Sequence, residues 1–117
     1  EYAGLYNEVA PLVQKALDQI GLVAVPEELP FETFYRRLEE AASQMFIFRW
    51  NFSVADASPF LDAIVHSRDP ARGLGTLNGA ALSDPVLDDA IELAAHESRS
   101  DVRLQRLQEV LQQVSDH

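Results

Sequence analysis

Helical patterns alternate with two short apolar runs in the first half of the chain, and this order limits the folds that it can adopt. Residues 22–25 read L-V-A-V and residues 45–50 read M-F-I-F-R-W. The second run is almost continuously apolar, which is typical of a β-strand covered on both faces of a parallel sheet. Helices that alternate with such strands indicate an α/β layer. We therefore expect an α/β fold with helices packed on a small mixed or parallel sheet.

Apolar residues at three- and four-residue spacing predict the helices of this fold. The expected ranges are 5–20, 31–42, 58–66, 83–94 and 100–114. Gly21 supplies a left-handed cap for the first helix, which Pro11 is expected to kink or restart. Ser58 is expected to cap the third helix. Residues 67–82 contain three glycines and few apolar residues, so we expect a long surface loop there.

The length of the chain, 117 residues, fits one domain or one compact part of a larger one. Two strands cannot cover the apolar faces of so many helices. We hypothesise that the segment was cut from a larger sheet, or that it forms a homo-oligomer by pairing an exposed sheet edge with another copy. The chain begins with Glu1 rather than Met, which we take to indicate an excised or processed segment.

Charge and cysteine content exclude several classes of function. The chain has nine Lys and Arg residues and nineteen Asp and Glu residues. The resulting net charge of -10 disfavours binding to nucleic acid or to anionic lipid. The absence of cysteine excludes a disulfide scaffold, a thiolate nucleophile and a sulfur-ligated metal site. No apolar run approaches the roughly twenty residues that a bilayer-spanning helix needs.

The sequence contains no recognisable catalytic motif. His66, His96 and His117 lie far apart and lack the spacing of metal ligands. The glycines between residues 73 and 79 do not follow a strand and are not joined by Lys and Ser or Thr, so they form no phosphate loop. We expect no enzyme activity, no metal and no cofactor.

The stretch R-W-N-F-S-V-A-D-A-S-P-F, residues 49–60, is the candidate binding site. Trp50 would stand at the carboxyl end of the second predicted strand, the edge where open α/β sheets bind ligands. Its indole offers a flat apolar face, and Asn51, Ser53 and Asp56 add hydrogen-bonding groups. Equally, Trp50 and Phe52 could simply pack against the following helix.

Four segments have a characteristic order along the chain. They are V-A-P-L-V-Q-K-A-L-D-Q-I-G-L-V-A-V, P-F-E-T-F-Y-R-R-L, F-I-F-R-W-N-F-S-V-A-D-A-S-P-F-L-D-A-I-V-H-S and S-D-P-V-L-D-D-A-I-E-L-A. Together they resemble the family 5 extracellular solute-binding proteins of ABC importers, the dipeptide-, oligopeptide- and nickel-binding type. The closing helix, R-S-D-V-R-L-Q-R-L-Q-E-V-L, is also similar to that family.

The resemblance implies that residues 1–117 form one segment of the C-terminal lobe of a two-lobed protein with the periplasmic-binding-protein type II fold. Such a protein traps a peptide or another small solute between its lobes and delivers it to an ABC permease in the membrane. It is periplasmic or extracellular, either free or lipid-anchored. The residues that correspond to the wall of the cleft are Trp50, Asn51, Phe52 and Ser53, with Arg49 and Asp56 beside them.

Two departures from the family pattern bear on the ligand. Peptide-binding relatives usually have an acidic residue three positions after the Trp, where it pairs with the α-amino group of the ligand, and this chain has Ser53 there. A small residue usually precedes the Trp, and here it is Arg49. The resemblance therefore implies a neutral or anionic solute, unless the loop bends so that Asp56 takes the acidic role.

A different class of function is open as well. The chain could be a small helical protein–protein interaction domain without a ligand cleft, in which the apolar stripe from Leu104 to Val114 contacts a partner. A fragment of a hydrolase is a third interpretation.

Overall fold

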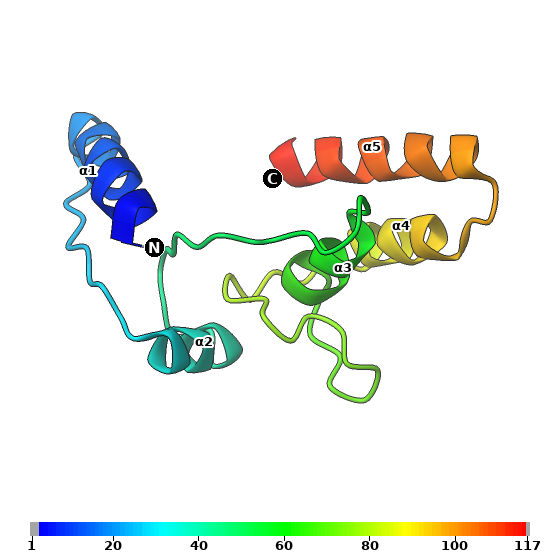
Figure 1. Cartoon of the computed structure of the whole chain (residues 1–117), viewed down its shortest axis with the longest axis horizontal. Coiled ribbons are helices and arrows are strands. Elements are labelled where there is room, and N and C mark those ends of the chain that lie inside the picture. The colour runs from blue at the N-terminus through cyan, green and yellow to red at the C-terminus, as the bar shows by residue number, and fades with distance from the viewer. Residues whose placement is uncertain (1–2, 117) are drawn as a thin grey trace. The chain divides into compact units, whose positions relative to one another are not determined.

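The computed structural model describes residues 3–116, in which helices form the regular structure (Figure 1). The helices are α1 (Ala3–Gln19), α2 (Phe31–Glu39), α3 (Ser58–Phe60), the π-helix η1 (Leu61–Val65), α4 (Pro85–His96) and α5 (Ser100–Asp116). Helices form at all five predicted places, but α2 ends at Glu39, before its predicted end, and the predicted third helix is divided into α3 and η1. The chain divides into two compact units whose boundary lies between Phe34 and Tyr35.

The predicted α/β fold is wrong, because no sheet forms among the described residues. The expected strands at 22–25 and 45–50 are irregular segments, and the only β-type pairing in residues 3–116 is a single antiparallel bridge between Asp69 and Leu74. Leu22, Val23 and Val25 are 56%, 88% and 87% exposed. An apolar, β-branched run favours extended backbone, but a strand also needs a partner edge for its hydrogen bonds.

Two further expectations depended on that sheet. The described residues contain no sheet of a periplasmic-binding-protein type II lobe. They also offer no exposed sheet edge through which a second copy could pair. The finding corrects both expectations, because each required strands that this chain does not form in its described part.

Helix α1 ends as its sequence predicts. Gly21 adopts φ 80°, its amide donates to the carbonyl of Asp18 at 3.1 Å, and the amide of Leu22 donates to the carbonyl of Leu17 at 3.0 Å. This pattern is a Schellman cap, which a glycine in the left-handed region allows. Pro11 neither ends nor restarts the helix, since α1 continues through it to Gln19.

The main hydrophobic core lies in the second unit, where α4 and α5 run antiparallel side by side and α3, which continues into η1, packs against α4 (Figure 1). The buried core residues are Leu61, Val65, Leu87, Ile91, Ala94, Leu107 and Val110. The carboxylate of Asp84 caps α4 by accepting from the amides of Val86 and Leu87 at 2.9 and 3.2 Å. No helix in the described residues has the length and apolar content needed to cross a membrane.

The loop between η1 and α4 was expected to be a surface loop, but hydrogen bonds from two of its side chains hold it in place. Asn78 is completely buried, and its amide group donates to the carbonyls of His66 and Leu82 at 3.0 and 2.8 Å. Its oxygen accepts from the amide of Leu82 at 3.0 Å. The guanidinium of Arg68 donates to the carbonyls of Leu38, Glu39 and Asn78, which ties the end of α2 to this loop.

Candidate functional site

Trp50 is fixed by aromatic contacts on two sides. Its ring meets Phe48 at a centroid distance of 6.3 Å and Phe60 at 5.9 Å, both edge to face. Along residues 45–50 the half-buried aromatic residues alternate with exposed ones, so Arg49 is exposed on the other side of the segment from Trp50. This geometry orients the indole while leaving it half-buried rather than sealed in a core.

The residues after Trp50 form an open rim. Phe52 is 57% exposed and contacts Phe60 with one part of its ring, at a centroid distance of 6.2 Å. Asn51 and Ser53 are exposed. The structure therefore brings Trp50 and Phe52 together on Phe60 and leaves polar groups beside them in contact with solvent. We call residues 50–53 the Trp50 wall.

Asp56 is turned toward α5. Its Oδ1 atom accepts from the backbone amide of Ser58 at 2.9 Å, and its Oδ2 atom lies 2.9 Å from Nη2 of Arg103. The same nitrogen donates to the hydroxyl of Ser58 at 2.8 Å. The expected cap by Ser58 is thus wrong, because α3 begins at Ser58 and its N-cap position is Ala57, which makes no side-chain cap hydrogen bond. The hydroxyl of Ser58 accepts from Arg103 instead of capping the helix.

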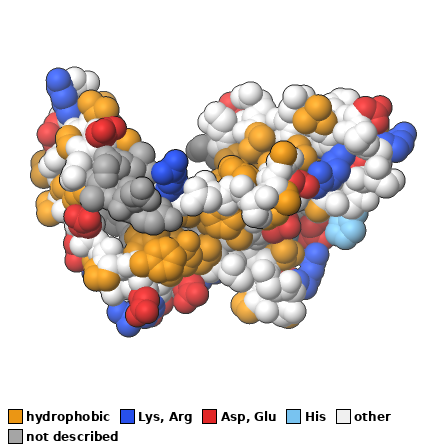
Figure 2. Space-filling view, in the orientation of Figure 1, with side chains coloured by type: hydrophobic (Ala, Val, Ile, Leu, Met, Phe, Trp, Pro, Cys, Tyr) orange, Lys and Arg blue, Asp and Glu red, His pale blue; other side chains and the backbone are white. Residues whose placement is uncertain are grey.

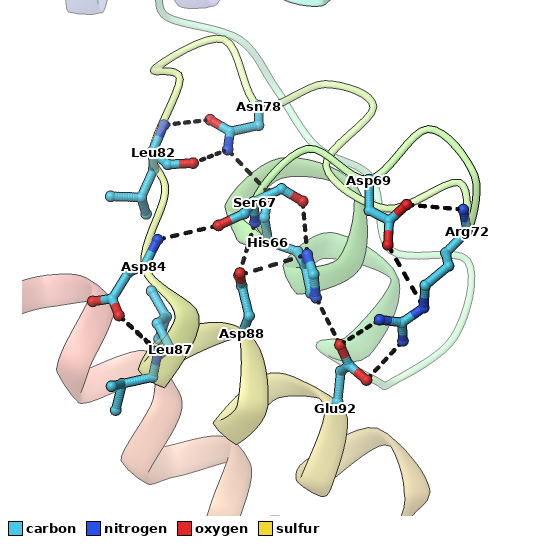
Figure 3. Close-up of polar contacts among 11 residues, drawn as sticks. His66, Ser67, Asp69, Arg72, Asn78, Leu82, Asp84, Leu87, Asp88 and Glu92 are labelled. Carbon is cyan, nitrogen blue, oxygen red and sulfur yellow. Dashed lines mark hydrogen bonds and ion pairs between the residues drawn. The ribbon is translucent and has the colours of Figure 1, made fainter.

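A second polar cluster, which the sequence did not predict, surrounds the buried His66 (Figure 3). We call His66, Ser67, Arg72, Asp88 and Glu92 the His66 cluster. The Nδ1 atom of His66 lies 2.7 Å from the carbonyl oxygen of Ser67, and Nε2 lies 3.1 Å from Oε1 of Glu92. Asp88 accepts from the amide of Ser67 at 2.8 Å and lies 3.5 Å from Nδ1.

These contacts favour the charged imidazolium, because both ring nitrogens face oxygen acceptors and only the doubly protonated ring donates to both. Burial by itself lowers the pKa of His66, but the hydrogen bonds to Ser67 and Glu92 and the charges of Asp88 and Glu92 together raise it above the ordinary value. His66 therefore joins the loop to α4 through contacts that favour its protonated form.

Arg72 completes the cluster from the loop. Its two terminal nitrogens donate to the two oxygens of Glu92 at 2.8 and 2.7 Å. The hydrogen bonds from Arg72, followed by that from His66, lower the pKa of the Glu92 carboxyl to about 2. Asp88 and Glu92 stand four residues apart on α4, a spacing that is also typical of an ordinary solvated helix face, so the spacing does not indicate their contacts with His66.

The neighbouring face of α4 holds a shallow open depression lined by Asp89, Glu92, Leu93 and His96. The Nδ1 atom of His96 lies 2.8 Å from the carbonyl of Glu92 on its own helix. Within residues 3–116 no group of three or more His, Asp or Glu side chains is arranged to hold a metal ion. The depression therefore has no group of side chains that could bind a metal ion among the described residues.

Comparisons with models of known protein families, with curated proteins and with solved structures give no match to this chain.

Proposed function

We propose that this chain is part of the substrate-binding component of an ABC importer and contributes one wall of its ligand cleft. The observation that supports the proposal best is the geometry of Trp50. The indole is held by Phe48 and Phe60 and stands next to the exposed residues Asn51, Phe52 and Ser53. A fixed aromatic face beside a few polar groups is a common form of small-molecule binding surface.

The order of the sequence motifs supports the same proposal, since the resemblance assigns residues 50–53 to the cleft. The exposed apolar side chains also support the proposal, because the rest of a larger binding protein could cover them (Figure 2). Val23 and Val25, at 88% and 87% exposed, are the most prominent. In the proposal they contact other parts of the same binding protein, which is periplasmic or extracellular and has the permease as its partner.

The proposed role is binding, with no chemistry of its own. The titratable groups that lie closest together, in the His66 cluster, are engaged with one another and hold the loop on α4. Asp56 is paired with Arg103. We therefore assign ligand contact to the Trp50 wall rather than to these groups.

Nuclear magnetic resonance tests the proposal directly. A panel of di- and tripeptides, free and N-acetylated, is added at millimolar concentration to the ¹⁵N-labelled chain, and amide shifts are followed. We expect saturable shifts centred on residues 49–53, lost in Trp50→Ala. Met45→Ala is the matched control, because Met45 is 59% exposed on the same segment. Shifts that are absent, or that survive in Trp50→Ala, would contradict the proposal.

A second candidate function is a helical protein–protein interaction domain. Leu104 and Leu111, seven residues apart on α5, are 58% and 43% exposed, whereas Leu107 and Val110 between them are buried in the core. Such a stripe suits the groove of a protein partner. In the peptide titration, shifts centred on α5 with residues 49–53 unchanged would favour this second function.

A further inference from the structure

An ion pair follows the Trp50 wall closely along the chain. Among residues 50–60, Asp56 is the only charged residue, and its carboxylate meets Arg103 of α5 at 2.9 Å. Both side chains are largely shielded, with 28% of Asp56 and 25% of Arg103 exposed. The two opposite charges therefore cancel at short range.

The carboxylate is held in place from two sides. The amide of Ser58 donates to Oδ1 at 2.9 Å, and Arg103 donates to the same oxygen at 3.0 Å. The hydrogen bond from Ser58 lowers the pKa of the Asp56 carboxyl most, burial opposes it, and Arg103 lowers it further. Asp56 is thus ionised at neutral pH, and Arg103 is the group that balances its charge.

The ion pair belongs to the same local structure as the wall. Asp56 accepts from the amide of Ser58, the first residue of α3, and Phe60 at the end of α3 contacts both Trp50 and Phe52. Arg49 is exposed on the opposite side of its segment from the aromatic residues. The next charged residue along the chain is Asp62, which is half-buried in η1 and whose carboxyl is repelled by that of Asp56.

We propose that Arg103 sets ligand specificity by neutralising Asp56, so that the Trp50 wall selects small solutes that bear no net charge beside their apolar part. The inference rests on the proposed function and names its ligand class. The indole face contacts the flat apolar part of the solute, and Asn51 and Ser53 offer hydrogen bonds. Without Arg103 the carboxylate attracts cations, and without the carboxylate Arg103 attracts anions.

Three probes with one aromatic group and different charges test this at pH 7. They are N-acetyl-phenylalaninamide, which is neutral, phenylalaninamide, which is a cation, and N-acetyl-phenylalanine, which is an anion. Trp50 is the only Trp of the chain, so its emission reports binding at the wall itself. We expect the wild-type protein to bind the neutral probe most tightly.

Two variants shift the preference in opposite directions. Arg103→Gln is expected to strengthen binding of the cation relative to the anion by about threefold or more, and Asp56→Asn to do the reverse. Asp56→Asn retains an oxygen that can accept from Ser58, so it tests the inference even if Arg103→Gln unfolds. Arg99→Gln is the matched control, because it removes the same charge from a side chain that is 69% exposed.

The outcomes separate the two proposals. Equal affinity of the wild-type protein for the three probes would overturn the specificity assigned to Arg103 and leave the binding function in place. The same would follow if Arg99→Gln shifted the preference as much as Arg103→Gln, since net charge alone would then explain it. Emission unchanged by every probe in all four proteins would overturn both proposals.

Discussion

The Nε2 atom of His66 and the Oε1 atom of Glu92 lie 3.1 Å apart, although 26 positions separate the two residues in the sequence. Arg72 binds the same carboxylate from the tip of the loop, so Glu92 joins the end of η1, the loop and α4 (Figure 3). Because His66 is buried and its ring nitrogens both face acceptors, the stability of this part of the protein depends on its protonation.

Raising the pH is expected to destabilise the second unit through His66. The pKa of His66 is raised in the folded protein, so its contribution is complete below the unfolded value of about 6.5 and is lost as pH rises through the folded value. We compare the melting temperatures of wild type and His66→Gln between pH 5.5 and 9 by circular dichroism. The advantage of the wild type should shrink with rising pH.

His96→Gln is the control for that experiment, because His96 is exposed and its ring contacts the carbonyl of Glu92 on its own helix. This variant should keep the pH dependence of the wild type. A difference between wild type and His66→Gln that stays constant across the pH range would show that protonation of His66 does not stabilise the fold.

Asn78 is expected to be the most sensitive polar residue of the loop. Its side chain makes three hydrogen bonds while completely buried, so Asn78→Ala leaves two carbonyls and one amide without their partner. We expect the free energy of unfolding to fall by about 3 kcal/mol. Urea unfolding, monitored by Trp50 emission, measures this loss. Asn51→Ala, at an exposed position, should change it by less than about 0.5 kcal/mol. A similar loss in both variants would contradict this assignment.

The helices could be predicted from the sequence because their signals are local. Gly21 ends α1 and Asp84 begins α4 through contacts within a few residues. The strand predictions are wrong because an apolar run does not specify a partner edge. Among the described residues, no strand pairs with the exposed segment that contains Val23 and Val25. The His66 cluster was missed because its members meet only in the folded chain. The role of Trp50 in binding stays a prediction.

Replacing Ala41 by glycine is expected to stabilise the protein. Ala41 follows α2 with φ 48°, and its amide donates to the carbonyl of Leu38 at 3.1 Å, the cap geometry that glycine adopts at Gly21. Relief of the left-handed strain, about 1–2 kcal/mol, exceeds the entropy cost of glycine, about 0.5–1 kcal/mol. Urea unfolding of Ala41→Gly should show a net gain of about 0.5–1 kcal/mol. Ala95→Gly, within α4, should instead lose about 1 kcal/mol. Destabilisation by Ala41→Gly would refute the strain argument.

Gly75 and Gly73 provide a matched pair that separates backbone strain from steric conflict. Both have positive φ, 61° and 72°, so alanine at either position costs about 1–2 kcal/mol in backbone strain. A Cβ atom at Gly75 would lie 2.5 Å from the carbonyl oxygen of His66, whereas one at Gly73 meets nothing within 4 Å. The atoms near Gly75 belong to the backbone that the His66 cluster holds, so they cannot move aside easily. We therefore expect Gly75→Ala to lose about 3 kcal/mol in urea unfolding and Gly73→Ala only the strain. Equal losses would mean that the backbone around His66 yields, and that the loop is held less firmly than these contacts indicate.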